Sequence, residues 1–110
     1  MALNKKNRLK KKLDFEDVFK KGRAIKGVFL FVKYKKNKLG VPRFGFVISA
    51  KVAKKAFERN KIRRAISETA RHVIGDLDGY DIIVFATYKT ITVDKKDISG
   101  DFLEVIKKIR

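Results

Sequence analysis

The sequence has no cysteine, no tryptophan, one proline and one histidine in 110 residues. Without cysteine, the chain can form neither a disulfide scaffold nor a zinc site with thiolate ligands, so zinc fingers are excluded. The lone His72 has no second imidazole to join it, and we interpret it as incidental to function. The acidic residues are scattered over turns and helix ends, so we expect no protein metal site and no catalytic residue.

Long apolar runs are also missing. No stretch approaches the roughly 18 apolar residues needed to span a bilayer. The start, MALNKKNRLKKK, lacks the apolar segment of a signal peptide. We therefore expect a soluble cytoplasmic protein that has no membrane partner.

Acidic residues are few: 12 Asp and Glu stand against 29 Lys and Arg, which leaves a formal charge of +17. The positive charges on such a small chain repel one another, and a polyanionic partner would offset this repulsion. Nucleic acid is the candidate for that partner. Binding should then weaken steeply as salt rises, because counterions are released from the nucleic acid.

The apolar content is enough for one modest core: the mass is 12.7 kDa, 45% of residues are hydrophobic and nine are Phe. We predict a single RNA-binding domain over residues 1–110. Within it, residues 1–12 contain six cations and no acid, and we expect a flexible basic tail.

Hydrophobic periodicity predicts helices over 13–21, 53–74 and 95–110 and strands over 24–34, 43–49 and 80–88. The connection between the first two strands is short, so we expect them to pair as an antiparallel hairpin. The strand over 80–88 is apolar on both faces and should lie centrally in the sheet. The last helix is expected to have a kink or a late start at Ser99 and Gly100.

The helix over 53–74 divides into two sides at 100° per residue. Its apolar sector holds Ile62, Ala65, Ile66, Thr69 and Val73. The opposite side holds Asn60, Arg64, Ser67 and Arg71, while Arg59 and Arg63 share a flank. Such a helix buries one side against a sheet and presents guanidinium groups to phosphates on the other.

Four motifs in order, DFEDVFKKG, PRFGFVIS, AKVAKKAFERNKIRR and DIIVFA, follow the basic amino terminus. In order and spacing the chain resembles the bacterial ribonuclease P protein component over essentially its full length. The resemblance implies a single-domain α/β sandwich with a small mixed sheet and the element order α-β-β-β-α-β-α. It also implies a left-handed crossover, an exception to the usual rule, and a fourth short strand, which we expect at residues 23–26.

The resemblance further implies a function. Family members bind the catalytic RNA of ribonuclease P and the 5′ leader of precursor tRNA, and they assist removal of that leader. The chemistry belongs to the RNA and to Mg²⁺ held mainly by the RNA. This chain would be an accessory subunit with no catalytic residue of its own and no small-molecule substrate.

One implied site is the basic helix, with the loop before it, lying against the catalytic RNA. Arg59 and Asn60 match the family's Arg-Asn-Arg signature, and Lys61 stands where Arg is usual, which gives up a planar two-pronged contact. The residues assigned to this site are Lys51, Lys54, Lys55, Arg59, Asn60, Lys61, Arg63, Arg64 and Arg71.

The second implied site is a cleft between the first helix and the open sheet face, where unpaired leader nucleotides bind. The residues assigned to it are Phe15, Phe19, Phe29, Phe31, Lys33 and Val47. Leu30, Val32, Phe46 and Ile48 should face the basic helix instead. Phenylalanine rings stack on any base, which suits a subunit that accepts many leaders.

Other interpretations stay open at this point. Phe15 and Phe19 could be packing groups, and a slip of one residue would exchange the faces on which Phe29 and Phe31 lie. The cations of the helix could form a solvated surface. For the whole chain, the alternatives are a ribosomal or chaperone-like protein that binds structured RNA, and an independent nuclease that cleaves without RNA.

Overall fold

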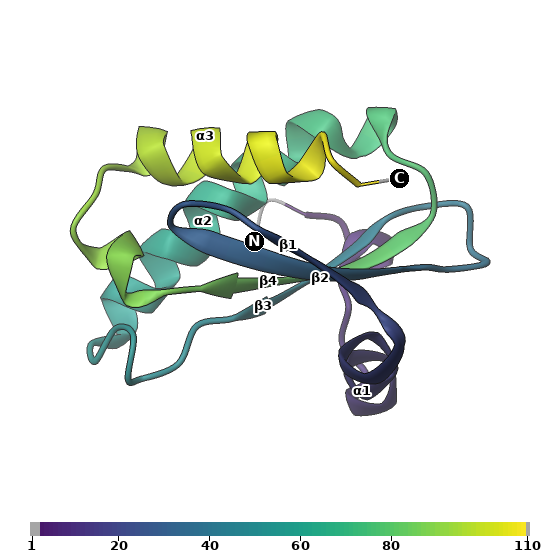
Figure 1. The fold of residues 1–110 in the computed structure, drawn as a ribbon, viewed down its shortest axis with the longest axis horizontal. Helices are drawn as coiled ribbons and strands as arrows, with labels where there is room; N and C mark the ends of the chain where they lie inside the picture. The colour runs from purple at the N-terminus through teal and green to yellow at the C-terminus, as the bar shows by residue number, and fades with distance from the viewer. Residues whose placement is uncertain (1–2, 110) are drawn as a thin grey trace.

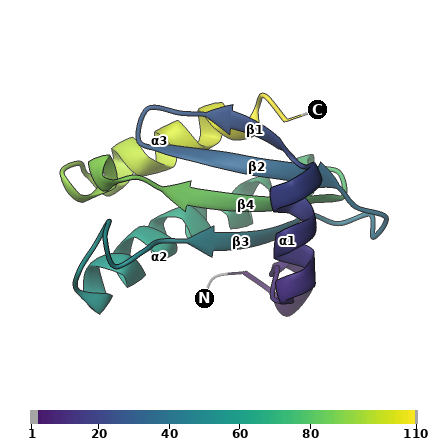
Figure 2. The same ribbon diagram turned by 60° about the horizontal axis from the view of Figure 1, so that its bottom comes forward.

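The computed structural model describes residues 3–109, in which helices cover both faces of a four-stranded sheet (Figure 1). In chain order the elements are α1 Lys12–Lys21, β1 Arg23–Lys26, β2 Leu30–Lys36, β3 Arg43–Val47, α2 Ala56–Val73, β4 Tyr80–Ala86 and α3 Lys95–Ile106. Short 3₁₀ turns, η1 Lys5–Asn7, η2 Ile74–Asp76 and η3 Tyr88–Ile91, lie between them. Figure 2 shows α1 in front of the sheet and α2 and α3 behind it.

The strand order is β1-β2-β4-β3, and this corrects the expected hairpin. β3 does not pair with β2; it pairs in parallel with β4, which lies antiparallel to β2. β4 takes the centre because it is apolar on both faces: Ile82 and Val84 face one way, Ile83 the other, and all three are completely buried. The short connection between β2 and β3 fixes their opposite directions but does not make them neighbours.

The segment predicted as one strand over 24–34 forms two antiparallel strands, β1 and β2. The strand that the resemblance implies at residues 23–26 is therefore confirmed. The turn between the two strands is held by Asp101 of α3, whose carboxylate accepts hydrogen bonds from the backbone N–H groups of Val28, Phe29 and Leu30 at 2.8, 2.9 and 3.1 Å. At Gly27 an added Cβ would lie 2.5 Å from this carboxylate, so a larger residue there would displace Asp101 from the turn.

α2 connects the parallel strands β3 and β4. In Figure 2 both strands point the same way, β4 lies above β3 and α2 passes behind them, so the crossover is left-handed. The helix begins three residues later than predicted, because residues 49–55 form a turn and an extended lead-in that buries Ala53.

The apolar side of α2 is wider than the sequence pattern indicates. Ile62, Ala65 and Ile66 are buried as predicted, but so are Ala70 and Ser67. Ser67 lies with Asn60 and Arg64, as predicted, but it is buried and not exposed. Ser67 is four residues after Arg63, on the flank of the helix, where its small side chain is completely enclosed.

α3 begins at Lys95, directly after Asp94, and continues through Ser99 and Gly100. The prediction of a late start is wrong: Gly100 lies inside the helix, on its exposed side, where an added Cβ would meet open space. The helix stops at Ile106, and Ile109 is buried beyond its end.

The amino-terminal segment also differs from expectation. Within residues 3–9, Leu3, Asn7 and Leu9 are buried, and the Leu9 N–H donates to the carbonyl of Phe44 at 2.8 Å. The prediction of a flexible tail is therefore wrong for this part; residues 1 and 2 lie outside the described residues. Its few apolar side chains cover the edge of β3, a contact that local composition does not reveal.

Two hydrophobic clusters hold the sheet between its helices. The larger one packs Leu30, Val32, Ile82 and Val84 against α2 and α3. The smaller one joins Leu9, Val18 and Ile83 on the α1 side and takes in the partly buried Phe15, Val47 and Phe85. Because α1 is short, it covers only part of this face, and aromatic side chains lie beside it.

Candidate nucleic-acid interface

The first candidate surface is the exposed side of α2 together with the loop before it. Asn60, Arg64 and Arg71 are exposed along the helix, as predicted. Lys51, Lys54 and Lys55 are exposed in the preceding loop. All these residues lie on one rigid element and its lead-in, which presents their charge at fixed spacing.

Arg59 and Arg63 are partly buried, and both are held by hydrogen bonds. The Nη1 group of Arg59 donates to the carbonyls of Ala53 and Lys54 at 2.8 and 3.1 Å, so this arginine fixes the loop before α2. The Nη1 group of Arg63 donates to Oδ1 of Asn60 at 2.9 Å. This bond directs the amide N–H₂ of Asn60 away from Arg63, where it can donate to an incoming ligand.

A shallow hollow lies among Asn60, Arg63, Arg64 and Ser67. Guanidinium and amide groups converge on it, and these are the donors that bind phosphate oxygens. Lys61 is separate: it is exposed on the opposite flank of α2 and lines a cavity with Ile62 and Ile98. The sequence prediction placed Lys61 together with the arginines, and the structure does not.

The second candidate surface is the sheet face beside α1. The rings of Phe31 and Phe85 are stacked, with centroids 4.6 Å apart and planes 3° from parallel. Phe19 meets Phe85 edge-on at 5.3 Å, and the Lys33 ammonium lies 5.3 Å from the centre of the Phe19 ring. Phe19 is 42% exposed, so an aromatic surface with an adjacent cation is open to a ligand.

Phe15 lies deeper than Phe19. Its ring rests on β3 at Gly45, where an added Cβ would come within 2.5 Å of the ring. Phe15 also lines a hollow with Arg8, Lys10 and Arg63. Phe15 is therefore a packing residue on one side of its ring. Another side borders this hollow, and its contact with RNA stays a prediction.

Val47 packs against the same small cluster, as its predicted face requires. Phe29 is outside the aromatic group: it precedes β2, and the structure shows its backbone bonded to Asp101 and Thr87. Phe85 belongs to the group but was missed, because a strand apolar on both faces looks wholly buried. The alternation of β4 was the available signal, since Phe85 has the same parity as Ile83.

Ion pairs fix α1 on the sheet. Asp17 pairs with Lys35 of β2 and, at 3.6 Å, with Lys21. The hydrogen bond from Lys35 holds the pKa of the Asp17 carboxyl below its ordinary value of 3.8. Asp14 lies 3.4 Å from Arg43 of β3. The helix that carries Phe15 and Phe19 is thus tied to two strands.

Arg43 also joins the two parallel strands. Its Nε and Nη2 groups donate to the two oxygens of Asp81 at 2.8 and 2.6 Å, a bidentate pair that is largely buried. The bond to Asp81 raises the pKa of Arg43 above its ordinary value. Asn37 donates to the same carboxylate at 2.9 Å and to the carbonyl of Val41 at 3.1 Å, which fixes the connection between β2 and β3.

The described residues do not fit a protein-held metal site. Among residues 3–109, no three Asp, Glu or His side chains gather closely enough to hold an ion. The exposed His72 at the end of α2 belongs to no such group of described residues. None of the helices in this part of the chain has the length and apolarity that crossing a bilayer requires.

Residues 3–110 match the family model described as Ribonuclease P. The chain belongs to the ribonuclease P protein family. The ribonuclease P protein component of Fusobacterium nucleatum is 39% identical over 106 residues, covering 92% of this chain and 95% of that one. That of Clostridioides difficile is 34% identical over 110 residues, with 98% and 96% covered.

Solved ribonuclease P proteins share the fold. That of Staphylococcus aureus has a TM-score of 0.87 at 31% identity, covering 92% of this chain and 93% of that one. That of Thermotoga maritima, in complex with 1-(4-fluorophenyl)-2-thiourea, has the same score and identity, with 94% and 100% covered. Family membership makes this chain the protein component of a ribonucleoprotein endoribonuclease, and its partner is RNA.

Proposed function

We propose that the chain binds the catalytic RNA of ribonuclease P along α2 and the 5′ leader of precursor tRNA on the aromatic face beside α1. The observation that supports this division is the position of Arg63. It lines the hollow with Asn60 and Arg64 on one side and the hollow with Phe15 on the other. The two surfaces therefore meet at one arginine, and two RNA strands could lie next to each other there.

The α2 surface supplies affinity for RNA. Exposed cations surround the hollow at Asn60, and the formal charge of +17 extends the attraction over the molecule. Contacts of this kind go to phosphates, so they position the protein without reading base identity. Their strength falls with salt as counterion release requires.

The aromatic face allows the protein to bind leaders of different base sequence. Phe19, Phe31 and Phe85 offer ring faces and edges, and Lys33 lies beside them for a phosphate. Stacking of a base on such rings contributes about 1–3 kcal/mol and is nearly independent of which base is present. A subunit that accepts many different leaders needs this kind of contact.

Mg²⁺ in this proposal is held by RNA phosphates, because the described residues offer no cluster of carboxylates for it. Mg²⁺ held there would supply the activation of the attacking water and the stabilisation of the leaving oxygen, and no residue of this chain is assigned either role. The cations of this chain reduce repulsion between the phosphates of the two RNAs, so less Mg²⁺ is needed to bring them together. We place the assembly in the cytoplasm.

Leader removal from precursor tRNA at low Mg²⁺ tests the proposal, with catalytic RNA alone, the protein alone and the two together. We expect rapid cleavage only in the mixture. RNA binding without faster cleavage would favour a ribosomal or chaperone-like role. Cleavage by the protein alone would show an independent nuclease, and either result would overturn the proposal.

A further inference from the structure

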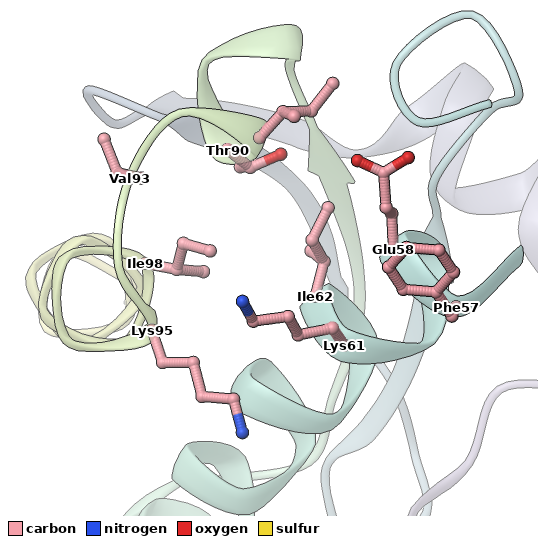
Figure 3. A pocket seen from close by; sticks show the side chains of 9 residues that line it. Phe57, Glu58, Lys61, Ile62, Thr90, Val93, Lys95 and Ile98 are labelled. Carbon is pink, nitrogen blue, oxygen red and sulfur yellow. The ribbon is translucent and has the colours of Figure 1, made fainter. Parts of the chain in front are cut away.

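A cavity lies outside both surfaces, between the start of α2, η3 and the start of α3 (Figure 3). It has a volume of about 130 Å³. Ile62 and Ile98 face each other across it, and both are almost completely buried. Thr90 lies at its inner end with its hydroxyl bonded to the carbonyl of Thr87 at 2.7 Å. Apolar side chains therefore form part of its inner wall.

An exposed aromatic ring stands at the mouth of this cavity. Phe57 is 65% exposed although it is a large apolar side chain, and it belongs to neither hydrophobic cluster. The Lys55 ammonium lies 5.7 Å from the centre of its ring. Phe57 is one turn before Asn60 and Lys61, so the ring continues the RNA-facing side of α2 toward the cavity.

The rim of the cavity is charged. Lys61 and Lys95 stand on it, with Glu58 beside Phe57 as a hydrogen-bond acceptor. Figure 3 shows the Lys61 ammonium directed over the opening between α2 and α3. These groups suit an unpaired nucleotide. The base can stack on the Phe57 ring and lie against the apolar walls, the lysines can bind its phosphates, and the carboxylate can accept a hydrogen bond from an exocyclic amine.

We propose that this cavity binds one unpaired nucleobase of the RNA that lies along α2, with the base against Phe57 and its neighbouring phosphates at Lys61 and Lys95. The volume is below the roughly 300–1,000 Å³ of pockets that enclose whole small molecules, so only part of a ligand enters. The charge of +17 favours RNA over a protein segment. The inference rests on the proposed function only for the identity of that RNA.

The first test compares Phe57→Ala with Leu39→Ala, another exposed apolar side chain, which lies in the connection between β2 and β3. We measure affinity of the full chain for the catalytic RNA and chemical modification of every unpaired base. Phe57→Ala should weaken binding about 5- to 150-fold, as loss of one stacked base does. One base protected by the wild type should become reactive in this variant alone. Equal affinities and identical protection for the two variants would overturn the proposal.

The second test is independent of the catalytic RNA. Adenosine 5′-monophosphate and ribose 5-phosphate are titrated into isotope-labelled protein, and NMR signals of Thr90 and Ile98 are followed. The nucleotide should shift these signals and the sugar phosphate should not. Equal signal shifts with both compounds would show that the cavity binds phosphate and not the base. Shifts that depend on protein concentration alone would show that a second copy of the chain occupies the cavity. Each result would overturn the proposal. If the nucleotide shifts these signals but the protein does not stimulate leader removal, the proposed function is wrong and the assignment of the cavity to a nucleobase remains.

Discussion

The Asp101 carboxylate provides a sharp test of how the fold holds its sheet. It accepts hydrogen bonds from Val28, Phe29 and Leu30, and it is the contact by which α3 fixes the turn between β1 and β2. The change to make is Asp101→Asn, which preserves size and shape. Asparagine keeps one acceptor oxygen but replaces the other with an N–H₂ donor that faces backbone N–H groups.

The expected magnitude follows from these contacts. A hydrogen bond to a charged group contributes about 1.5–3 kcal/mol. The introduced asparagine would lose at least one of the three hydrogen bonds, and the bonds that remain would no longer have a charged acceptor. Water can replace the bond to the N–H of the exposed Val28. We expect a loss of about 2–3 kcal/mol in the free energy of unfolding, or about 8–12 °C in Tm for a chain of this length.

Thermal and urea unfolding measure the loss, and hydrogen exchange at the amides of Val28, Phe29 and Leu30 locates it. Glu104→Gln is the matched control, because Glu104 is exposed on the same helix and, among residues 3–109, forms an ion pair only with Lys107, at 3.5 Å. That change should cost less than about 0.5 kcal/mol. If the two variants unfold alike, or if these amides exchange no faster in Asp101→Asn, the carboxylate does not hold the turn.

Four further outcomes are expected. Arg64→Ala should weaken binding of the catalytic RNA, and the plot of log K against log salt concentration should become less steep by about 1, because one phosphate contact is lost. Titrations at several salt concentrations measure both effects. Phe19→Ala should weaken binding of precursor tRNA relative to mature tRNA by about 1–3 kcal/mol, because one stacking ring is lost. Gly45→Ala should destabilise the protein by about 1–3 kcal/mol in urea unfolding, because the new Cβ meets the Phe15 ring at 2.5 Å. Asp17→Asn should lower stability near neutral pH, and its difference from the wild type should shrink as pH falls below 3.8. The pKa of Asp17 is depressed in the folded state, so its contribution is present above the unfolded pKa and is lost as pH falls through the folded one.

Controls separate these effects from general damage. Leu13→Ala changes another exposed apolar residue of α1 and should leave the preference for precursor over mature tRNA unchanged. Gly75→Ala places a Cβ in open space and should leave stability nearly unchanged. The division into two sites fails if Arg64→Ala and Phe19→Ala lose affinity for the same RNA. A constant difference between Asp17→Asn and wild type from pH 6 to pH 2 would contradict the assigned pKa.

The alternation of residues along each strand correctly predicted which face of the sheet a side chain lies on, whereas the predicted pairing of the strands was partly wrong. The parity of β2 placed Leu30 and Val32 on the face of the basic helix and Phe31 on the face of the first helix. Leu30 and Val32 lie in the cluster that holds residues of α2, and of α3 as well, while Phe31 stacks on Phe85 on the opposite face. Pairing depends on contacts between distant segments: nothing local in residues 37–42 shows that β4 enters between β2 and β3. The assignment of site residues to particular RNAs stays a prediction.

The errors in the predicted details have physical causes. Leu3 and Leu9 looked like part of a charged tail because the edge they cover, at Phe44, comes more than thirty residues later in the sequence. Ser67 looked exposed because its angle on the helix places it with Asn60 and Arg64, whereas its small side chain is buried there. For Leu3 and Leu9 a partner remote in sequence decided the outcome, and helix or strand periodicity carries no information about such partners.

The strand order has a consequence for the newly made chain. β4 lies between β2 and β3 but is synthesised after both of them. While translation has not yet reached residues 80–86, β2 and β3 each present an open backbone edge, and α2 has no completed sheet to pack on. Fragments that end before Tyr80 should therefore stay unfolded and prone to aggregate, and folding should be triggered by release of the last quarter of the polypeptide.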